Sequence, residues 1–319
     1  MPLRKEGKRE KPVAINLMIA DGGMGDHLCY LVVADYIVKN IYWVKPFIWV
    51  PDYLYEFAKN VLPKEAKVNT FTNGAKYYNE KLLGISTGWS DYGHTPMRIH
   101  PIDYAAHRLI DSDLTIEQKN YLRFNPEGID VSKYKLPEKY VVISVGVTTK
   151  TKELPKEVVQ QIVDYVIEKG YTPVFLGKSA SDLGYEGKAI KANMAEIDYN
   201  KGIDLRNQTS LTESAAVIAG AKAIVGMEGG LTHLAGSTDT PIIAGYSIVS
   251  PEQMMPIRNY IKGYNVFPVI AEASLECRYC QTKTPLLYSA NYYYCYFDDY
   301  KCLKQLTFNK WKQQIDKVL

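Results

Sequence analysis

The stretch that decides the fold lies near the N-terminus. It reads Val13-Ala-Ile-Asn-Leu-Met-Ile19, then Asp21-Gly-Gly-Met-Gly25, then Asp26-His-Leu-Cys-Tyr-Leu-Val-Val-Ala-Asp-Tyr-Ile-Val-Lys39. The first run is short, apolar and β-branched at its start, which predicts a buried strand. The glycines predict a flexible turn, and the apolar residues of the last run recur at helical spacing. Strand, glycine turn and helix, in this order, open an α/β unit.

The same order of elements begins again in the second half of the chain. Tyr140-Val-Val-Ile-Ser-Val-Gly146 predicts another buried strand, and Pro155 marks the start of a helix that Gly170 ends. Further strands and helices alternate up to Gly245. Two strand–helix arrays in tandem predict two α/β domains, which suits a chain of 319 residues. Open parallel sheets of this kind bind ligands at the carboxyl ends of their strands, so we expect a central cleft.

The chain therefore divides into four predicted segments. Residues 1–12 form a basic flexible arm, and residues 13–135 form an N-terminal Rossmann-like domain. Residues 136–303 form a C-terminal Rossmann-like domain, and residues 304–319 form a terminal amphipathic helix expected to pack back toward the N-terminal domain. The stretch from Asn125 to Lys139 lacks periodicity, and we interpret it as the interdomain linker.

Composition narrows the class of protein. Apolar residues make up 46% of the chain, enough for a sizeable core, and the net charge of +3 permits an anionic substrate without requiring nucleic acid. No run of about 18–20 apolar residues predicts a membrane span, and the basic arm is not followed by the apolar core of a secretory signal. We therefore expect a cytoplasmic protein with reduced cysteines, whose arm allows contact with anionic lipid headgroups at the inner membrane.

The first candidate site is Met24-Gly25-Asp26-His27, between a strand and a helix. Gly25 allows a tight turn and a close approach of ligand to backbone. A carboxylate at Asp26 would stand at the lip of the cleft, where it can accept a proton from a hydroxyl group. The competing interpretation is that Asp26 caps the helix and that His27 serves in packing or hydrogen bonding.

The second candidate site is the segment that runs from Gly146 to Pro155. Its hydroxyls and ammonium groups suit phosphate oxygens. They belong to Thr148, Thr149, Lys150 and Lys152. The competing interpretation is a solvated loop with its lysines in water. The sequence of a P-loop is not present here.

The third candidate site is Gly226-Met-Glu-Gly-Gly-Leu-Thr-His-Leu-Ala235, again a strand, a glycine turn and a helix. Backbone N–H groups around Gly229, Gly230 and Leu231 are placed to face an anion, and Thr232 adds a hydroxyl. A diphosphate leaving group would be stabilised there without a metal. A tight turn that needs glycine for steric reasons is an equally good interpretation.

Four of the five cysteines gather near the C-terminus. Cys277 and Cys280 have the spacing of a metal-binding knuckle, and Cys295 and Cys302 follow. These four are candidates for a structural zinc site. Reduced, packed cysteines are the default alternative, and we predict no catalytic metal.

At these motifs the sequence resembles glycosyltransferase family 9, the ADP-heptose:lipopolysaccharide heptosyltransferases. The matches are the Gly25-Asp26 turn, Val142-Ile-Ser-Val-Gly146 followed by Lys152-Glu-Leu-Pro155, and Leu205-Arg-Asn-Gln-Thr-Ser-Leu211. The block from Gly226 to Pro241 resembles the family's most specific motif, Asp-Thr-Gly-Leu-x-His-Leu-Ala followed by Thr-Pro. The matches occur in the family's order from about residue 13 to the C-terminus.

The resemblance implies a GT-B fold, with acceptor on the N-terminal domain and donor nucleotide on the C-terminal domain. It implies inversion at the anomeric carbon, a nucleotide-sugar substrate and no cofactor. By position, Asp26 would be the base, with Gly25 and His27 on the acceptor side. Lys152 would contact the donor phosphates, the turn from Gly229 to Thr232 would hold the diphosphate, and His233 would support that turn.

Three positions depart from the family pattern. Glu228 and Gly229 stand where the family usually has Asp and Thr, and Leu154 replaces the usual Trp. Gly229 lacks a hydroxyl that would bind phosphate. These departures leave the donor sugar and base open.

The acceptor and the activity also have alternatives. Lipopolysaccharide core is the acceptor that the family implies, and a modified base in DNA is a second possibility. A non-catalytic protein that binds nucleotide sugars or glycans with the same fold is a third, supported by Glu228 and Gly229. The sequence leaves the oligomeric state open.

Overall fold

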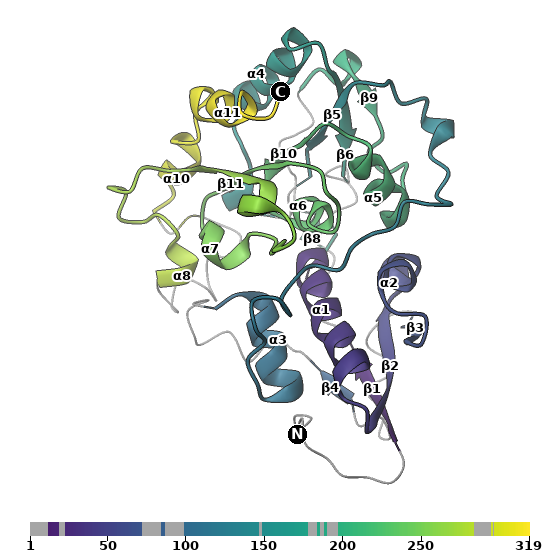
Figure 1. Ribbon diagram of the computed structural model, residues 1–319. Helices are drawn as coiled ribbons and strands as arrows, with labels where there is room; N and C mark the ends of the chain where they lie inside the picture. The colour runs from purple at the N-terminus through teal and green to yellow at the C-terminus, as the bar shows by residue number, and fades with distance from the viewer. Residues whose placement is uncertain are drawn as a thin grey trace.

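The chain forms two α/β units, each built on a parallel sheet with helices packed against it (Figure 1). This computed structural model describes residues 12–18, 23–71, 84–86, 99–146, 149–177, 184–185, 188–189, 197–283, 295 and 297–319. The strands of the first sheet lie within residues 13–86, and those of the second lie within residues 140–270. The predicted α/β architecture with two parallel sheets is confirmed.

The N-terminal unit has the strand order β3-β2-β1-β4, and every pair is parallel. Its strands are β1 (Val13–Met18), β2 (Val44–Pro51), β3 (Lys67–Phe71) and β4 (Gly84–Ser86). Its helices are α1 (Met24–Asn40), η1 (Asp52–Leu54), α2 (Tyr55–Val61) and α3 (Pro101–Ile110). Helix α1 is buried on almost every side, because it contacts β2, α3 and α6. Its continuous apolar sequence follows from this central position.

The C-terminal unit has the strand order β12-β11-β10-β5-β6-β9, and its pairs are also parallel. Its strands are β5 (Tyr140–Ser144), β6 (Thr172–Leu176), β9 (Ile203–Asp204), β10 (Ile224–Met227), β11 (Ile242–Tyr246) and β12 (Val266–Ile270). The chain builds outward from β5 to β9 and then returns to place β10 on the other side of β5. Ligands of such sheets bind where the order reverses, at the carboxyl ends of β5 and β10.

Helices cover both faces of this second sheet, which explains its nearly continuous apolar strands. The helices are η4 (Lys150–Lys152), α4 (Lys156–Glu168), η7 (Tyr199–Lys201), α5 (Leu211–Ala219), α6 (Gly230–Ala235), α7 (Pro251–Met254), η8 (Lys262–Asn265), α8 (Cys280–Lys283), α10 (Lys301–Lys304) and α11 (Phe308–Ile315). The short strands β7 (Gly184–Tyr185) and β8 (Lys188–Ala189) form a separate pair. No helix among the described residues combines the length and the apolar character that crossing a membrane requires.

The C-terminal helix lies elsewhere than the sequence predicts. It begins at Phe308 rather than Lys304, and it packs against α4, β11 and β12 of the C-terminal unit rather than toward the N-terminal unit. The reason is its apolar face, because Trp311 and Ile315 are fully buried in the core beneath α4. Asp316 reinforces this position through an ion pair with Lys169 of 2.8 Å.

The two units contact each other through helices and through the segment that leads into the linker. Helix α1 packs against α6, and α2 packs against α5 (Figure 1). The backbone of Tyr121 donates to Ile257 O at 2.9 Å, and that of Phe124 donates to Ser237 O at 2.8 Å. Residues before the linker therefore already lie against the C-terminal unit. The linker contains η3 (Ser132–Tyr134).

Candidate active site

The N-termini of α1 and α6 meet where the two units touch. A β-carbon added to Gly25 would lie 2.5 Å from Cδ2 of His233, and one added to Gly230 would collide with the side chain of Met24. Each glycine therefore makes room for a residue of the opposite turn. The first and third sequence motifs, about 200 residues apart along the chain, form one site.

Asp26 is the third residue of α1 and is half-buried. Its Oδ2 accepts a hydrogen bond of 2.7 Å from the backbone N–H of Gly23, which is the residue that caps the helix. Burial raises the pKa of Asp26 to about 6, against the opposing effects of the Gly23 N–H, His233 and Lys152. Asp26 thus holds the first turn of the helix, and it also has the pKa that suits a base near neutral pH.

Lys152 and Glu228 form a buried ion pair at the switch point of the C-terminal sheet. Nζ of Lys152 lies 2.5 Å from Oε2 of Glu228, and Nε2 of His233 lies 3.3 Å from Oε1. Burial opposes the charge on Glu228, but Lys152 and His233 outweigh it and lower the pKa of Glu228 to about 2. The glutamate that departs from the family pattern therefore joins the second motif to the third.

The turn that leads into α6 differs in detail from the prediction. The hydroxyl of Thr232 donates to Gly229 O at 2.7 Å and accepts from Gly229 N–H at 2.9 Å, so both groups serve to close the turn. Gly230 and Leu231, both half-buried, follow at the start of α6. Amides in the first turn of a helix make no bond within that helix, which leaves Gly230 and Leu231 as the amides suited to an oxygen anion.

The remaining predicted site residues differ in burial and in their contacts. Thr149 is buried, and its Oγ1 lies 3.0 Å from Oγ1 of Thr151, whereas Nζ of the exposed Lys150 lies 5.4 Å from the ring centre of Tyr300. Thr148 lies outside the described residues. His27 is buried, with Nδ1 2.5 Å from the hydroxyl of Tyr53, as its packing interpretation predicts.

The sequence motifs miss two residues of the site, Cys29 and Tyr121. The hydroxyl of Tyr121 lies 2.6 Å from Nδ1 of His233 and 3.0 Å from Sγ of Cys29, and all three side chains are buried. Cys29 follows Asp26 by three residues, so helical spacing alone places it on the same face of α1. Tyr121 belongs to no motif, and only the fold brings it to His233.

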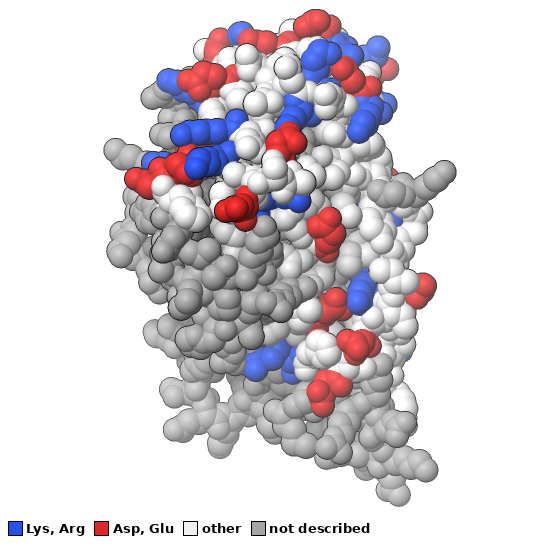
Figure 2. Space-filling model, turned by 90° about the vertical axis from the view of Figure 1, so that its left-hand side faces the viewer, with Lys and Arg blue, Asp and Glu red and all other residues white. Residues whose placement is uncertain are grey.

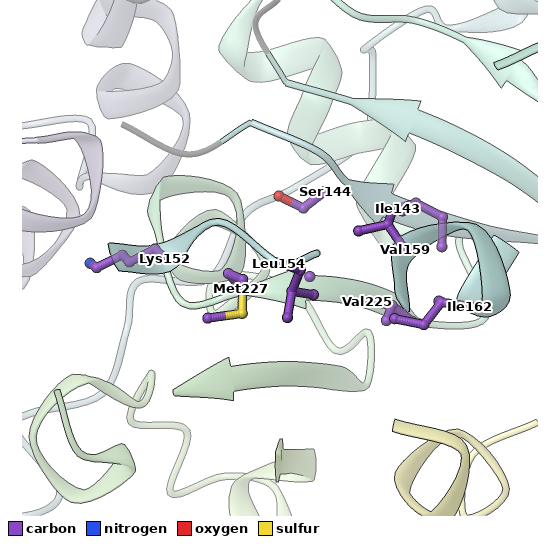
Figure 3. A pocket seen from close by; sticks show the side chains of 9 residues that line it. Ile143, Ser144, Lys152, Leu154, Val159, Ile162, Val225 and Met227 are labelled. Carbon is purple, nitrogen blue, oxygen red and sulfur yellow. The ribbon is translucent and has the colours of Figure 1, made fainter. Parts of the chain in front are cut away.

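A small cavity adjoins this cluster between β5, β10 and α4 (Figure 3). It contains about 350 Å³ of free space, part of it open to solvent, and its lining is mainly apolar. Leu154, which stands where the family usually has Trp, lines it, while the Lys152 side chain extends away from the other lining residues. The cavity is therefore a neighbour of the charged cluster rather than an anion-binding site.

The four C-terminal cysteines are free thiols that lie within electrostatic reach of one another. Burial, followed by the neighbouring Cys280, Cys277 and Cys295, raises the pKa of Cys302 to about 12. Among the described residues, no three His, Cys, Asp or Glu side chains are arranged to hold a metal ion. Structural zinc binding by these cysteines stays a prediction.

Comparisons with known proteins place this geometry in a family. The family model of Glycosyltransferase family 9 (heptosyltransferase) matches residues 100–282. Lipooligosaccharide heptosyltransferase 2 of Haemophilus ducreyi is 29% identical over 99 residues, which are 30% of this chain and 28% of that protein. A second relative, from Haemophilus influenzae, is 30% identical over 97 residues. These alignments span less than a third of the curated relatives.

Solved structures resemble the whole chain. TibC, an iron-containing dodecameric glycosyltransferase of enterotoxigenic E. coli, matches with a TM-score of 0.70 at 14% identity, over 100% of this chain and 77% of TibC. The E. coli ADP-heptose lipopolysaccharide heptosyltransferase II matches with a TM-score of 0.62 at 14% identity, over 95% and 98% of the two chains. At identities this low, the similarity shows the shared GT-B fold alone. The family membership rests on the family model, which covers more than half of the sequence. The chain therefore belongs to glycosyltransferase family 9.

Proposed function

We propose that the protein is an inverting glycosyltransferase that moves a heptose-like sugar from an ADP-linked donor to a hydroxyl of a glycan acceptor. One observation carries this proposal. A carboxyl group with a pKa of about 6 lies within electrostatic reach of a buried lysine, glutamate and histidine, where α1 of the N-terminal unit packs against α6 of the C-terminal unit. A base and a cationic site are the two groups that displacement of a nucleoside diphosphate needs.

The class of donor is supported by the relatives. The curated relatives are lipooligosaccharide heptosyltransferases, and structural neighbours are described as complexes with ADP or with an ADP-linked heptose. Because the switch point of this chain lies between β5 and β10, we place the donor's diphosphate beside Lys152 and the start of α6.

In the proposed reaction Asp26 takes the proton of the acceptor hydroxyl. The hydroxyl oxygen forms a bond to the anomeric carbon as the bond from that carbon to the diphosphate oxygen breaks. Attack from the face opposite the leaving group inverts the anomeric centre. Because Asp26 acts when ionised, we expect kcat/KM to fall as pH drops through about 6.

The departing diphosphate gains negative charge, which Lys152 and the amides of Gly230 and Leu231 are placed to stabilise. A lysine ammonium has three N–H donors, and Glu228 takes one of them. Glu228 therefore holds Lys152 in place while the ammonium faces the donor. This scheme needs neither a metal nor a cofactor, because the nucleotide is already an activated leaving group.

For the acceptor we propose a glycan hydroxyl, as in a lipopolysaccharide core. On the described part of the face shown in Figure 2, acidic and basic side chains are interspersed. The described part of this face therefore lacks the continuous basic surface that favours duplex DNA. A salt-sensitive affinity for duplex DNA would point instead to the modified-base acceptor.

The test is a thermal shift with ADP-, UDP-, GDP- and CMP-linked sugars in the presence of EDTA. We expect the ADP-linked sugar to raise Tm, with a stabilisation of about 2.7 kcal/mol at one hundred times Kd. No shift with any nucleotide would overturn the proposed donor site. A shift that EDTA abolishes would overturn metal independence.

Turnover separates an enzyme from a binding protein. With heptose-acceptor glycans and the ADP-linked sugar that binds, Asp26→Asn is expected to lower kcat about 100- to 10,000-fold while ADP affinity changes little. Full activity of Asp26→Asn would remove Asp26 as the base. Binding without turnover for every acceptor would favour a non-catalytic nucleotide-sugar-binding protein.

A further inference from the structure

We propose that Tyr121 is a positioning residue for the donor site, whose hydroxyl fixes the tautomer of His233 that holds Glu228 against Lys152. This inference rests on the proposed function for its effect on catalysis. Its structural part concerns only the protein's own side chains. Neither the sequence motifs nor the comparisons with known proteins assign a role to Tyr121.

The basis is an unbroken chain of contacts between buried side chains. Sγ of Cys29 lies 3.0 Å from the Tyr121 hydroxyl, which lies 2.6 Å from Nδ1 of His233. Nε2 of His233 then lies 3.3 Å from Glu228, and Glu228 lies 2.5 Å from Lys152. Each of these five residues is less than a tenth exposed. Hydrogen bonds in such surroundings are strong, and the loss of one leaves a buried polar atom unsatisfied.

The chemistry of the end groups sets the direction of the protons. Glu228 is ionised beside Lys152, so it accepts, and Nε2 of His233 must carry the proton that it donates. In a neutral imidazole Nδ1 is then an acceptor, so the Tyr121 hydroxyl must donate to it. That hydroxyl then accepts a hydrogen bond from the thiol of Cys29. The series of hydrogen bonds therefore runs from the thiol to the carboxylate of Glu228. Tyr121 thus selects the tautomer that Glu228 requires.

The hydrogen-bond network also joins three separate parts of the fold. Cys29 comes from α1 of the N-terminal unit, Tyr121 from the segment that leads into the linker, and His233 from α6 of the C-terminal unit. The network reaches α1 only through the contact between Cys29 and Tyr121, whereas the hydrogen bond that sets the tautomer joins Tyr121 to His233.

The ring of Tyr121 offers a second explanation, because it stacks on His233 with centroids 6.0 Å apart and planes at 15°. Tyr121→Phe keeps this ring and removes only the hydroxyl. Tyr140→Phe is the control, because it also removes a buried tyrosine hydroxyl, which donates a hydrogen bond of 2.7 Å to Val217 O away from the site. Comparison of the two variants separates a local effect on His233 from a general loss of stability.

The decisive measurement needs no substrate. In ligand-free protein with 15N-labelled histidine, we expect NMR to show His233 in one tautomer, protonated at Nε2, with its signals assigned by their loss in His233→Gln. Tyr121→Phe should give a mixture of tautomers or protonation of Nδ1, while Tyr140→Phe and Cys29→Ala leave the single tautomer. An unchanged His233 tautomer in Tyr121→Phe would overturn the proposal, and so would a changed one in Cys29→Ala.

Binding and turnover then test the link to the donor site. We expect Tyr121→Phe to weaken ADP affinity about three- to tenfold, by loss of one buried hydrogen bond, and Tyr140→Phe to leave it unchanged. Equal losses in both variants would reduce Tyr121 to a structural role. If the wild-type protein binds no ADP, the proposed function fails, and the NMR result still decides whether Tyr121 sets the tautomer.

Discussion

At the scale of single residues, Asp26 makes the hydrogen bond of a helix cap and has the pKa that its proposed role as a base requires. One oxygen accepts the N–H of Gly23 at the start of α1, while burial keeps the pKa of the carboxyl near 6. A fully exposed aspartate at a helix start would ionise more easily and would be a weaker base. The burial that suits Asp26 to its proposed role as a base therefore lowers folding stability at neutral pH.

That cost gives a prediction for Asp26→Asn. The folded-state pKa is raised, so the contribution of Asp26 to stability is present below about pH 4 and is lost as pH rises through about 6. Asn cannot ionise, and its Oδ1 still accepts the Gly23 N–H. We expect the variant to be more stable than wild type by about 1–3 kcal/mol at pH 8 and nearly equal at pH 4. Urea denaturation at both values checks this, and a pH-independent difference would contradict it.

The contribution of Glu228 to folding stability should depend on pH in the opposite direction. Its folded-state pKa of about 2 lies below its ordinary value of 4.5, so its stabilising effect is present at neutral pH and is lost as pH falls through that interval. Glu228→Gln leaves Lys152 buried without its counter-charge, which costs about 3–5 kcal/mol at pH 7. The difference from wild type should shrink between pH 4.5 and pH 2.5, as measured by thermal unfolding. Lys150→Gln, on an exposed lysine, is the control.

At the scale of elements, the decisive contact is between the two glycine turns. Sequence patterns identify each turn as a strand-to-helix junction, but they leave open why glycine is needed. The packing of α1 on α6 answers this for Gly25 and Gly230, whose missing side chains leave room for His233 and Met24. Gly229 is different, because its φ of 168° is extended backbone and an added β-carbon would find no atom closer than 3.9 Å.

This contrast gives a matched pair of variants. Gly25→Ala forces a methyl group against the His233 ring and should destabilise the protein by about 1–3 kcal/mol, with weaker ADP binding. Gly229→Ala should change the free energy of unfolding by less than about 0.5 kcal/mol. Chemical denaturation and ADP titration of both variants test the prediction. Equal effects would mean that the two turns do not approach as closely as the structure shows.

At the scale of the whole molecule, the two sheets are not independent bodies. One buried apolar cluster includes Ile48 of β2, Ala106 of α3, Val217 of α5 and Ala244 of β11. Residues of both units therefore share a core, and the segment around Tyr121 bonds to the C-terminal unit before the second sheet begins. Unfolding of one unit would expose apolar surface of the other.

We therefore expect the chain to unfold in one cooperative transition. Scanning calorimetry should give equal calorimetric and van't Hoff enthalpies, and fluorescence and circular dichroism should report the same midpoint. ADP should move that single transition to higher temperature, although its proposed site lies in the C-terminal unit. Two resolved transitions, of which ADP shifts only one, would show that the units are energetically separate.

The sequence by itself determined the α/β class, the two tandem arrays and the three turns, because each depends on local patterns of apolar residues, glycine and proline. It also named Asp26, Lys152, Glu228 and His233, since each lies in a short motif at the end of a strand. It misplaced the C-terminal helix, whose amphipathic face fits more than one surface. Strand order is non-local, and it is the reversal between β5 and β10 that places Lys152 beside Glu228.

Only the tertiary structure decided which of these residues act together. It paired Glu228 with Lys152, used Thr232 to close its own turn and left Lys150 exposed. It also brought in Tyr121, which no pattern singles out, because the contact to His233 joins residues 112 positions apart. Burial sets the pKa of Asp26, and burial is a property of the packed chain rather than of any one segment.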